Sequence, residues 1–154
     1  IDTDLEILIP DSYVENITER LSLYTQLDDL ETEEEMNKFA TELTDRFGPI
    51  PAQVQDLFTT LRCRIIACEL GFEKLILKNE QMRLYFISNP DSPYFESETF
   101  NHILRYIQTQ TKNARLKQVG KNFLLVVDKM KKMKDVLWFL EGAKPKAQSH
   151  CLIS

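Results

Sequence analysis

The chain has 154 residues, of which 43% are hydrophobic and 28% are charged. This is the size and composition of a globular domain with its own core, and they argue against a disordered or membrane-spanning chain. The net charge of -5 hides an asymmetry, because residues 1–60 carry 15 acidic and 3 basic side chains, whereas residues 61–154 carry 9 and 16.

Such segregated charge predicts either solvated faces or one end that docks a partner of opposite charge. The three cysteines, Cys63, Cys68 and Cys151, are too few and too unevenly spaced for a disulfide framework or a zinc site. We therefore expect small buried side chains in a reducing, cytoplasmic compartment. The first residue is Ile1 rather than Met, which suggests a piece of a longer protein.

Residues 1–9 alternate loosely between acidic and apolar side chains, which predicts an extended lead-in that ends at Pro10. Ser12 and Glu15 have the spacing of a capping box, so a helix is expected over residues 12–28. Its inward face is expected to hold Tyr13, Val14, Ile17, Leu21, Tyr24 and Leu27.

Thr32 and Glu35 form a second capping box, which predicts a helix over residues 33–46. Its buried positions are expected to be Met36, Phe39, Ala40, Leu43 and Phe47. Beside them runs a polar stripe at steps of three and four residues, formed by Glu35, Lys38, Glu42 and Asp45.

A sharp corner follows this helix. Gly48 can take the left-handed conformation that ends a helix, and Pro49 prevents continuation. Pro51 suits the first turn of a third helix, expected over residues 51–70 and closed by Gly71.

The second half of the chain predicts two hairpin–helix units. The expected hairpins are 74–77 with 82–87, and 114–119 with 123–127; the expected helices run from Ser97 to about 110 and from an Asp128 cap to Gly142. The fold class is therefore α+β: an N-terminal three-helix segment, followed by two hairpin–helix units forming a small antiparallel sheet covered by helices. Residues 1–142 are expected to form one domain and residues 143–154 a flexible tail.

Candidate catalytic chemistry is sparse in this sequence. All four glycines are expected at element boundaries, so no glycine-rich phosphate loop remains. The two histidines, His102 and His150, have no partner at metal-ligand or triad spacing. We therefore predict no enzyme activity, no metal and no cofactor in this domain, although the sequence leaves a pair of catalytic carboxylates open.

A nucleic-acid-binding module is the alternative. Eight cations cluster in the second half: Lys112, Arg115, Lys117, Lys121, Lys129, Lys131, Lys132 and Lys134. Tyr106, Phe123 and Trp138 are candidates for stacking on bases, although Trp138 is better placed for packing at the core or its edge. The acidic first half would repel a duplex, and the last four lysines spread around a helix.

The corner also carries a family resemblance. Residues 42–51 (ELTDRFGPIP) resemble the E-L-x-D-R-F-G-x-x-P signature of the C-terminal domain in the bacterial transcription-repair-coupling factor (Mfd) family. Residues 9–14 (IPDSYV) and 20–24 (RLSLY) are similar to its I-P-D-x-Y-I and R-L-x-x-Y motifs, and the close of the third helix at Leu70 and Gly71 also fits. Residues 76–141 match only in layout.

The resemblance implies the C-terminal regulatory domain of a larger ATP-driven DNA translocase that acts on stalled RNA polymerase. ATP and magnesium would belong to the parent motor. The domain would pack on a UvrB-like N-terminal module of the same chain, mask the surface that binds UvrA and restrain the motor. This is an autoinhibitory role in transcription-coupled nucleotide excision repair, and it involves DNA only through the parent motor and no membrane.

A mask that must be released favours a polar, salt-sensitive interface. The sequence then indicates the polar stripe together with Arg46 as the partner-binding residues: Glu35, Lys38, Glu42, Asp45 and Arg46. We expect Glu42 and Asp45 to pair with arginine or lysine on the UvrB-like module. The alternatives are that both carboxylates only solvate the helix, and that Arg46 neutralises its C-terminus.

Overall fold

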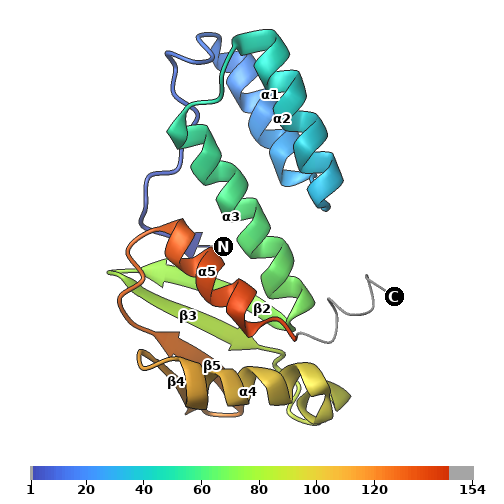
Figure 1. The fold of residues 1–154 in the computed structure, drawn as a ribbon, viewed down its shortest axis with the longest axis vertical. Helices are drawn as coiled ribbons and strands as arrows, with labels where there is room; N and C mark the ends of the chain where they lie inside the picture. Colours follow the sequence, from blue (N-terminus) through green and yellow to red (C-terminus); the bar gives the residue numbers. More distant parts are fainter. Residues whose placement is uncertain (1, 146–154) are drawn as a thin grey trace. The chain divides into compact units, whose positions relative to one another are not determined.

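The computed structural model describes residues 2–145 and divides into two compact units. The helical unit comprises residues 6–65, and the sheet unit comprises residues 1–5 and those from 66 onward. Figure 1 shows the elements of both units. None of the helices in the described chain is long and apolar enough to cross a membrane.

The helical unit contains α1 (Ile17–Asp28), α2 (Glu33–Phe47) and the first part of α3 (Ala52–Glu69). Its helices meet over a common apolar core formed by Ile9, Val14, Leu23, Leu27, Met36, Phe39, Leu43, Val54, Phe58 and Leu61. Arg64 of α3 donates through Nη2 to the backbone oxygens of Asp28 and Leu30, which satisfies carbonyls at and just beyond the end of α1.

The sheet unit contains five strands: β1 (Asp2–Thr3), β2 (Phe72–Lys78), β3 (Gln81–Phe86), β4 (Ala114–Val119) and β5 (Asn122–Val127). The order across the sheet is β1-β2-β3-β5-β4. The four longer strands pair antiparallel, as predicted, and the short β1 adds a parallel edge to β2 that the sequence pattern did not indicate. The α+β class is confirmed.

One face of this sheet is covered by α4 (Glu98–Gln110) and α5 (Met133–Ala143), preceded by the short 3-10 helix η1 (Pro93–Glu96). Phe86 of β3 packs on Phe100 of α4 with ring centroids 5.3 Å apart, and Tyr106 of α4 packs on Phe139 of α5 at the same separation. Strand side chains of the covered face are almost fully buried, including Leu75, Leu77, Met82, Leu84 and Leu125.

The predicted start of the first helix is wrong. The helix begins at Ile17, and Asn16 rather than Ser12 is the N-cap, accepting from the backbone nitrogen of Glu19 at 3.0 Å. Residues 11–13 form a turn, and Tyr13 and Val14 donate from their backbone nitrogens to the oxygen of Pro10. The helix buries Leu23 and Leu27, whereas Ile17 and Leu21 are 65% and 62% exposed.

The predicted start of the last helix is also wrong. After β5 the chain turns through Lys129, whose φ of +63° is incompatible with a helix, and α5 begins only at Met133. The carboxylate of Asp135 accepts from the backbone nitrogens of Lys131 and Lys132, so it takes the capping role expected of Asp128.

Two expectations at the end of the chain fail for packing reasons. Gly142 lies inside α5 instead of closing it, and a Cβ there would lie 2.5 Å from the Tyr106 hydroxyl oxygen. Trp138 is 72% exposed, whereas its neighbour Phe139 is buried. Most of the predicted tail, together with Cys151 and His150, lies outside the described residues.

Candidate protein-docking site

The polar stripe lies on a helix whose two ends are both fixed. At the N-terminus of α2 the Thr32 hydroxyl accepts from the backbone nitrogen of Glu35 at 3.1 Å, and the Glu35 carboxylate accepts from that of Glu31 at 3.0 Å. At the C-terminus Gly48 takes a φ of +91°, and its nitrogen donates to the Thr44 oxygen. The helix therefore presents its outer side chains on a firm backbone.

The buried side of α2 explains which of its side chains are free to face solvent. Met36, Phe39 and Leu43 are buried in the core of the helical unit. The predicted stripe lies beside this buried face, and all four of its members are exposed: Glu35, Lys38, Glu42 and Asp45.

These four side chains do not have equal freedom. Glu35 is engaged by the backbone of its own helix start. Among the described residues, the side chains of Lys38, Glu42 and Asp45 form no hydrogen bond or ion pair. The groups available for a partner are therefore these three.

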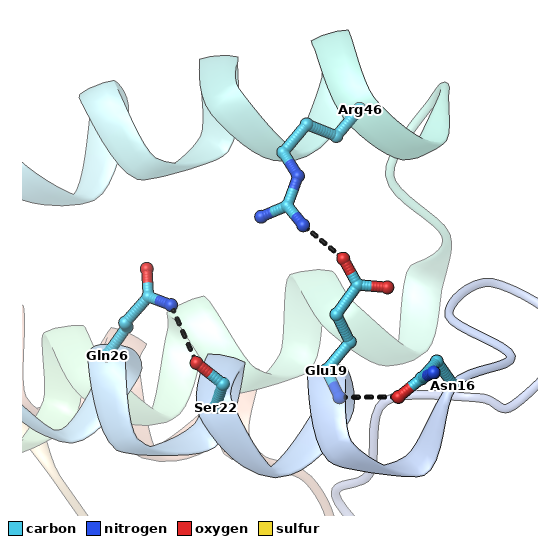
Figure 2. A network of polar contacts seen from close by, with 5 residues as sticks. All are labelled: Asn16, Glu19, Ser22, Gln26 and Arg46. Atoms are coloured by element: carbon cyan, nitrogen blue, oxygen red, sulfur yellow. Dashed lines mark hydrogen bonds and ion pairs between the residues drawn. The ribbon is translucent and has the colours of Figure 1, made fainter.

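Arg46 is held within the unit. Its guanidinium forms an ion pair with Glu19 of α1, and the two side chains reach across the gap between the helices in Figure 2. The guanidinium also lies 4.8 Å from the centre of the Phe47 ring. Both partners of the ion pair are about half exposed, which limits its contribution to roughly 1 kcal/mol or less.

Tyr13 fixes the corner after α2. Its hydroxyl donates to the Gly48 oxygen at 2.8 Å and approaches the Leu43 oxygen at 3.3 Å, and its ring lies 5.8 Å from that of Phe47. Burial raises the pKa of this phenol. These contacts tie the loop before α1 to the end of α2 and to the turn at Gly48.

His102 lies on α4, and Cys63 and Cys68 lie on α3. His102 places Nδ1 3.0 Å from the Ala143 oxygen. Cys63 is buried and Cys68 is exposed. Within residues 2–145, His, Cys, Asp and Glu side chains form no group of three or more that would suit a metal ion.

Comparison with known proteins decides the family. The sequence model of the TRCF domain matches residues 3–97, well over half of the chain. The chain belongs to the TRCF domain family. The predicted resemblance to the C-terminal domain of transcription-repair-coupling factors is thereby confirmed.

Individual relatives have low sequence identity to this chain, and those described below are all transcription-repair-coupling factors. The transcription-repair-coupling factor of Rickettsia bellii is 29% identical over 121 residues, covering 79% of this chain and 10% of the relative. That of Escherichia coli K12 is 37% identical over 68 residues, covering 44% of this chain and 6% of the relative. The chain spans about a tenth of the length of these relatives.

A solved structure shows the same fold. The crystal structure of the C-terminal domain of a transcription-repair coupling factor superposes with a TM-score of 0.72, covering 92% of this chain and 91% of that one, at 15% sequence identity. The α+β arrangement is therefore shared with a TRCF domain despite little sequence similarity.

The structure explains the TRCF motifs as packing devices. Arg20, from the second motif, donates through Nη1 to the Val14 oxygen at 2.7 Å, and the Tyr24 hydroxyl accepts from the Ile9 nitrogen at 2.6 Å. Together with the bond from Tyr13 to Gly48, these contacts tie the three separate motifs to one another.

Sequence reasoning did not assign these structural roles, and it overlooked Glu19 as the partner of Arg46. The available signal was that the TRCF motifs lie at separate positions in the chain. Residues that are far apart in the chain are constrained together when their side chains share hydrogen bonds. The Glu19–Arg46 pair had no local signal, because the two positions are 27 residues apart.

Proposed function

We propose that this chain is the regulatory, non-catalytic domain of a longer transcription-repair-coupling protein. It packs on a UvrB-like module of the same protein, masks the surface that binds UvrA and restrains the DNA-translocating motor. The parent motor uses ATP and magnesium, acts on DNA and on stalled RNA polymerase, and works in the cytoplasm. The chain itself holds no cofactor in this proposal.

The observation that carries the proposal is the unpaired part of the stripe on α2. Lys38, Glu42 and Asp45 are exposed on a helix capped at both ends, and none has a side-chain partner within the described residues. Because the backbone beneath them is fixed at both ends, binding has to order only the side chains themselves, which favours their use at an interface.

The chemistry of the stripe suits a reversible mask. Exposed ion pairs contribute roughly 0.2–1 kcal/mol each, so two pairs from Glu42 and Asp45 would hold an interface that a motor or partner can break. Such pairs weaken as ionic strength rises. The proposal assigns no partner contact to Arg46, because Glu19 already pairs with it. Glu35 is retained only as the cap that fixes the helix.

The test replaces both carboxylates, E42A and D45A together, in the longer protein that contains the UvrB-like module. If two ion pairs worth about 2 kcal/mol in total are lost, the open state gains up to about thirtyfold in population. UvrA binding and ATPase rate should both rise, and added salt should raise them less than in the unaltered protein.

A matched control removes two exposed carboxylates from the sheet unit, E96A and E141A together. It changes the net charge by the same amount, so it should leave both readouts near those of the unaltered protein. The proposal fails if circular dichroism shows an intact fold in the E42A/D45A protein while UvrA binding and ATPase rate stay unchanged, or if the control raises them equally.

A further inference from the structure

The second face of the sheet is rich in cations. Side chains on a strand alternate between faces, so the residues between the buried positions of β2, β3 and β4 share the side opposite the covered face. Five of them are basic, and all five are exposed: Lys74, Lys78, Arg83, Arg115 and Lys117. We call this surface the basic sheet face.

Strand register sets these cations in rows. Ile76 lies opposite Arg83, which lies opposite Val126, which lies opposite Arg115. The next row runs Lys74, Tyr85, Leu124 and Lys117. With strands roughly 4.8 Å apart, the outer cations of a row are separated by roughly 10–14 Å across the sheet.

The residues between the cations form an apolar floor. Leu124 and Val126 of the central β5 are each 2% exposed, and each has a long side chain opposite it on both neighbouring strands. Tyr85 is half-buried, with the Lys74 ammonium 5.8 Å from its ring centre. An open hollow of about 340 Å³ lies on the β2–β3 part of the sheet, lined by Ile76, Lys78, Asn79, Gln81 and Arg83.

Carboxylates neutralise only part of this charge. Asp2 pairs with Lys78 at 3.3 Å, and Asp128 pairs with Arg115 at 2.7 Å. Hydrogen bonds from Gln81 and Arg115 hold the pKa of Asp128 below its usual range. Within the described residues, Lys74, Arg83 and Lys117 have no carboxylate within ion-pair distance, and three cations remain for an external anion.

We propose that the basic sheet face binds single-stranded nucleic acid without base-specific readout. Arg83 and Lys117, with Lys74 beside the ring of Tyr85, contact backbone phosphates, and the partly exposed ring accepts a base. A cationic surface with an aromatic ring matches the chemistry of sequence-tolerant strand binding. The occupant is a polyanion because the unpaired groups of the face are all cations.

Two observations favour a single strand over a duplex or an acidic protein. A duplex brings one charge per roughly 1.7 Å of axis toward a chain whose net charge is -5, so repulsion is greater than for a short strand. An acidic peptide has no planar base that would stack on the Tyr85 ring between the cations. The inference does not involve α2, so it stands or falls independently of the proposed mask.

This surface is not the one that the sequence grouping indicated. Lys131 and Lys134, which the sequence placed in the basic cluster, lie before and within α5, whereas Lys74, Lys78 and Arg83 come from strands that no charge count along the chain brings together. Only Arg115 and Lys117 belong to both groups. Lysines that belong only to the sequence grouping, such as Lys131 and Lys134, can therefore serve as a control for the cations of the basic sheet face.

The experiment titrates the whole chain with a labelled oligothymidylate of about 12 nucleotides, followed by fluorescence anisotropy between about 50 and 200 mM salt. With three to five phosphate contacts, log K should fall with log salt with a slope of about -2 to -3.5. Replacing Arg83 and Lys117 with Gln should weaken binding roughly tenfold and make the slope about 1.4 smaller in magnitude.

Two further variants separate the parts of the site. Tyr85→Leu should weaken binding about fivefold or more with an unchanged salt slope, because it removes stacking and no charge. The charge-matched control, K131Q with K134Q, should change affinity less than about twofold. Thermal unfolding of each variant checks that the sheet unit remains folded.

Several results would overturn the inference. They are no binding at the lowest salt, an equal loss in the K131Q/K134Q control, and full binding by folded R83Q/K117Q protein. Tighter binding of a duplex of the same length, or an unaffected Tyr85→Leu variant, would rule out the single strand. More effective displacement by polyglutamate would assign the face to an acidic protein.

Discussion

At the scale of residues, Gly71 is required for two reasons, its backbone conformation and the close approach of the Tyr94 ring. Gly71 has a φ of +92°, and a Cβ there would lie 2.2 Å from the Tyr94 ring. The ring cannot withdraw freely, because its hydroxyl donates to the Leu70 oxygen at 2.5 Å and its centroid lies 6.1 Å from that of Phe86 and 5.6 Å from that of Phe100. Burial also raises the pKa of Tyr94.

Gly71→Ala should therefore destabilise the sheet unit more than the backbone conformation alone explains. The positive φ costs about 1–2 kcal/mol for alanine, and displacing the ring adds about 1–3 kcal/mol. Gly120→Ala is the matched control, since Gly120 has a φ of +64° and open space around its Cβ position. Urea unfolding should show the larger loss at Gly71, and equal losses would mean that the ring moves without cost.

At the scale of elements, the bounds of α2 are set by residues at its own two ends. The Thr32 cap, the three acidic residues of the first turn and Gly48 all lie within or next to the helix. Each acts locally, through orphan backbone groups or the helix dipole. The bounds predicted for α2 consequently agree with the structure to within one residue, and the stripe faces solvent as expected.

The Thr32 cap can be tested against a threonine in the same helix. Thr32→Ala should lower the free energy of unfolding by about 1 kcal/mol, because the Glu35 nitrogen loses its acceptor. Thr41 is exposed in mid-helix and only donates back to the Asn37 oxygen. Thr41→Ala should be neutral or slightly stabilising, since alanine has the higher helix propensity. If the two variants changed the free energy of unfolding in urea equally, the Thr32 cap would contribute no more than a mid-helix threonine.

The elements that the sequence misplaced depend on distant contacts. Ser12 with Glu15 has the spacing of a cap, yet residues 11–13 turn, and Tyr13 is directed to Gly48. Asp128 is drawn away from α5 by Gln81 and Arg115, which lie on other strands. The basic sheet face is hidden for the same reason, because strand register brings its cations together and spacing along the chain does not.

At the scale of the whole molecule, the described chain has a separate core for each unit. Leu43 is 2% exposed within the helical core, and Leu125 is fully buried in the sheet. The charge asymmetry along the sequence corresponds in part to the two units. The polar stripe lies in the helical unit, and the basic sheet face lies in the sheet unit. Separate cores favour local opening of one unit without loss of the other.

Hydrogen exchange on two core variants tests that independence. Leu43→Ala and Leu125→Ala each remove the same buried side chain and should cost about 2–5 kcal/mol. If the units open separately, Leu43→Ala lowers amide protection in α1 and α2 while β2, β3 and β5 keep theirs, and Leu125→Ala does the reverse. A uniform loss of protection over both units in either variant would show that they unfold together. In that case the α2 stripe could not be released by local opening, and a mask would have to detach with the domain folded.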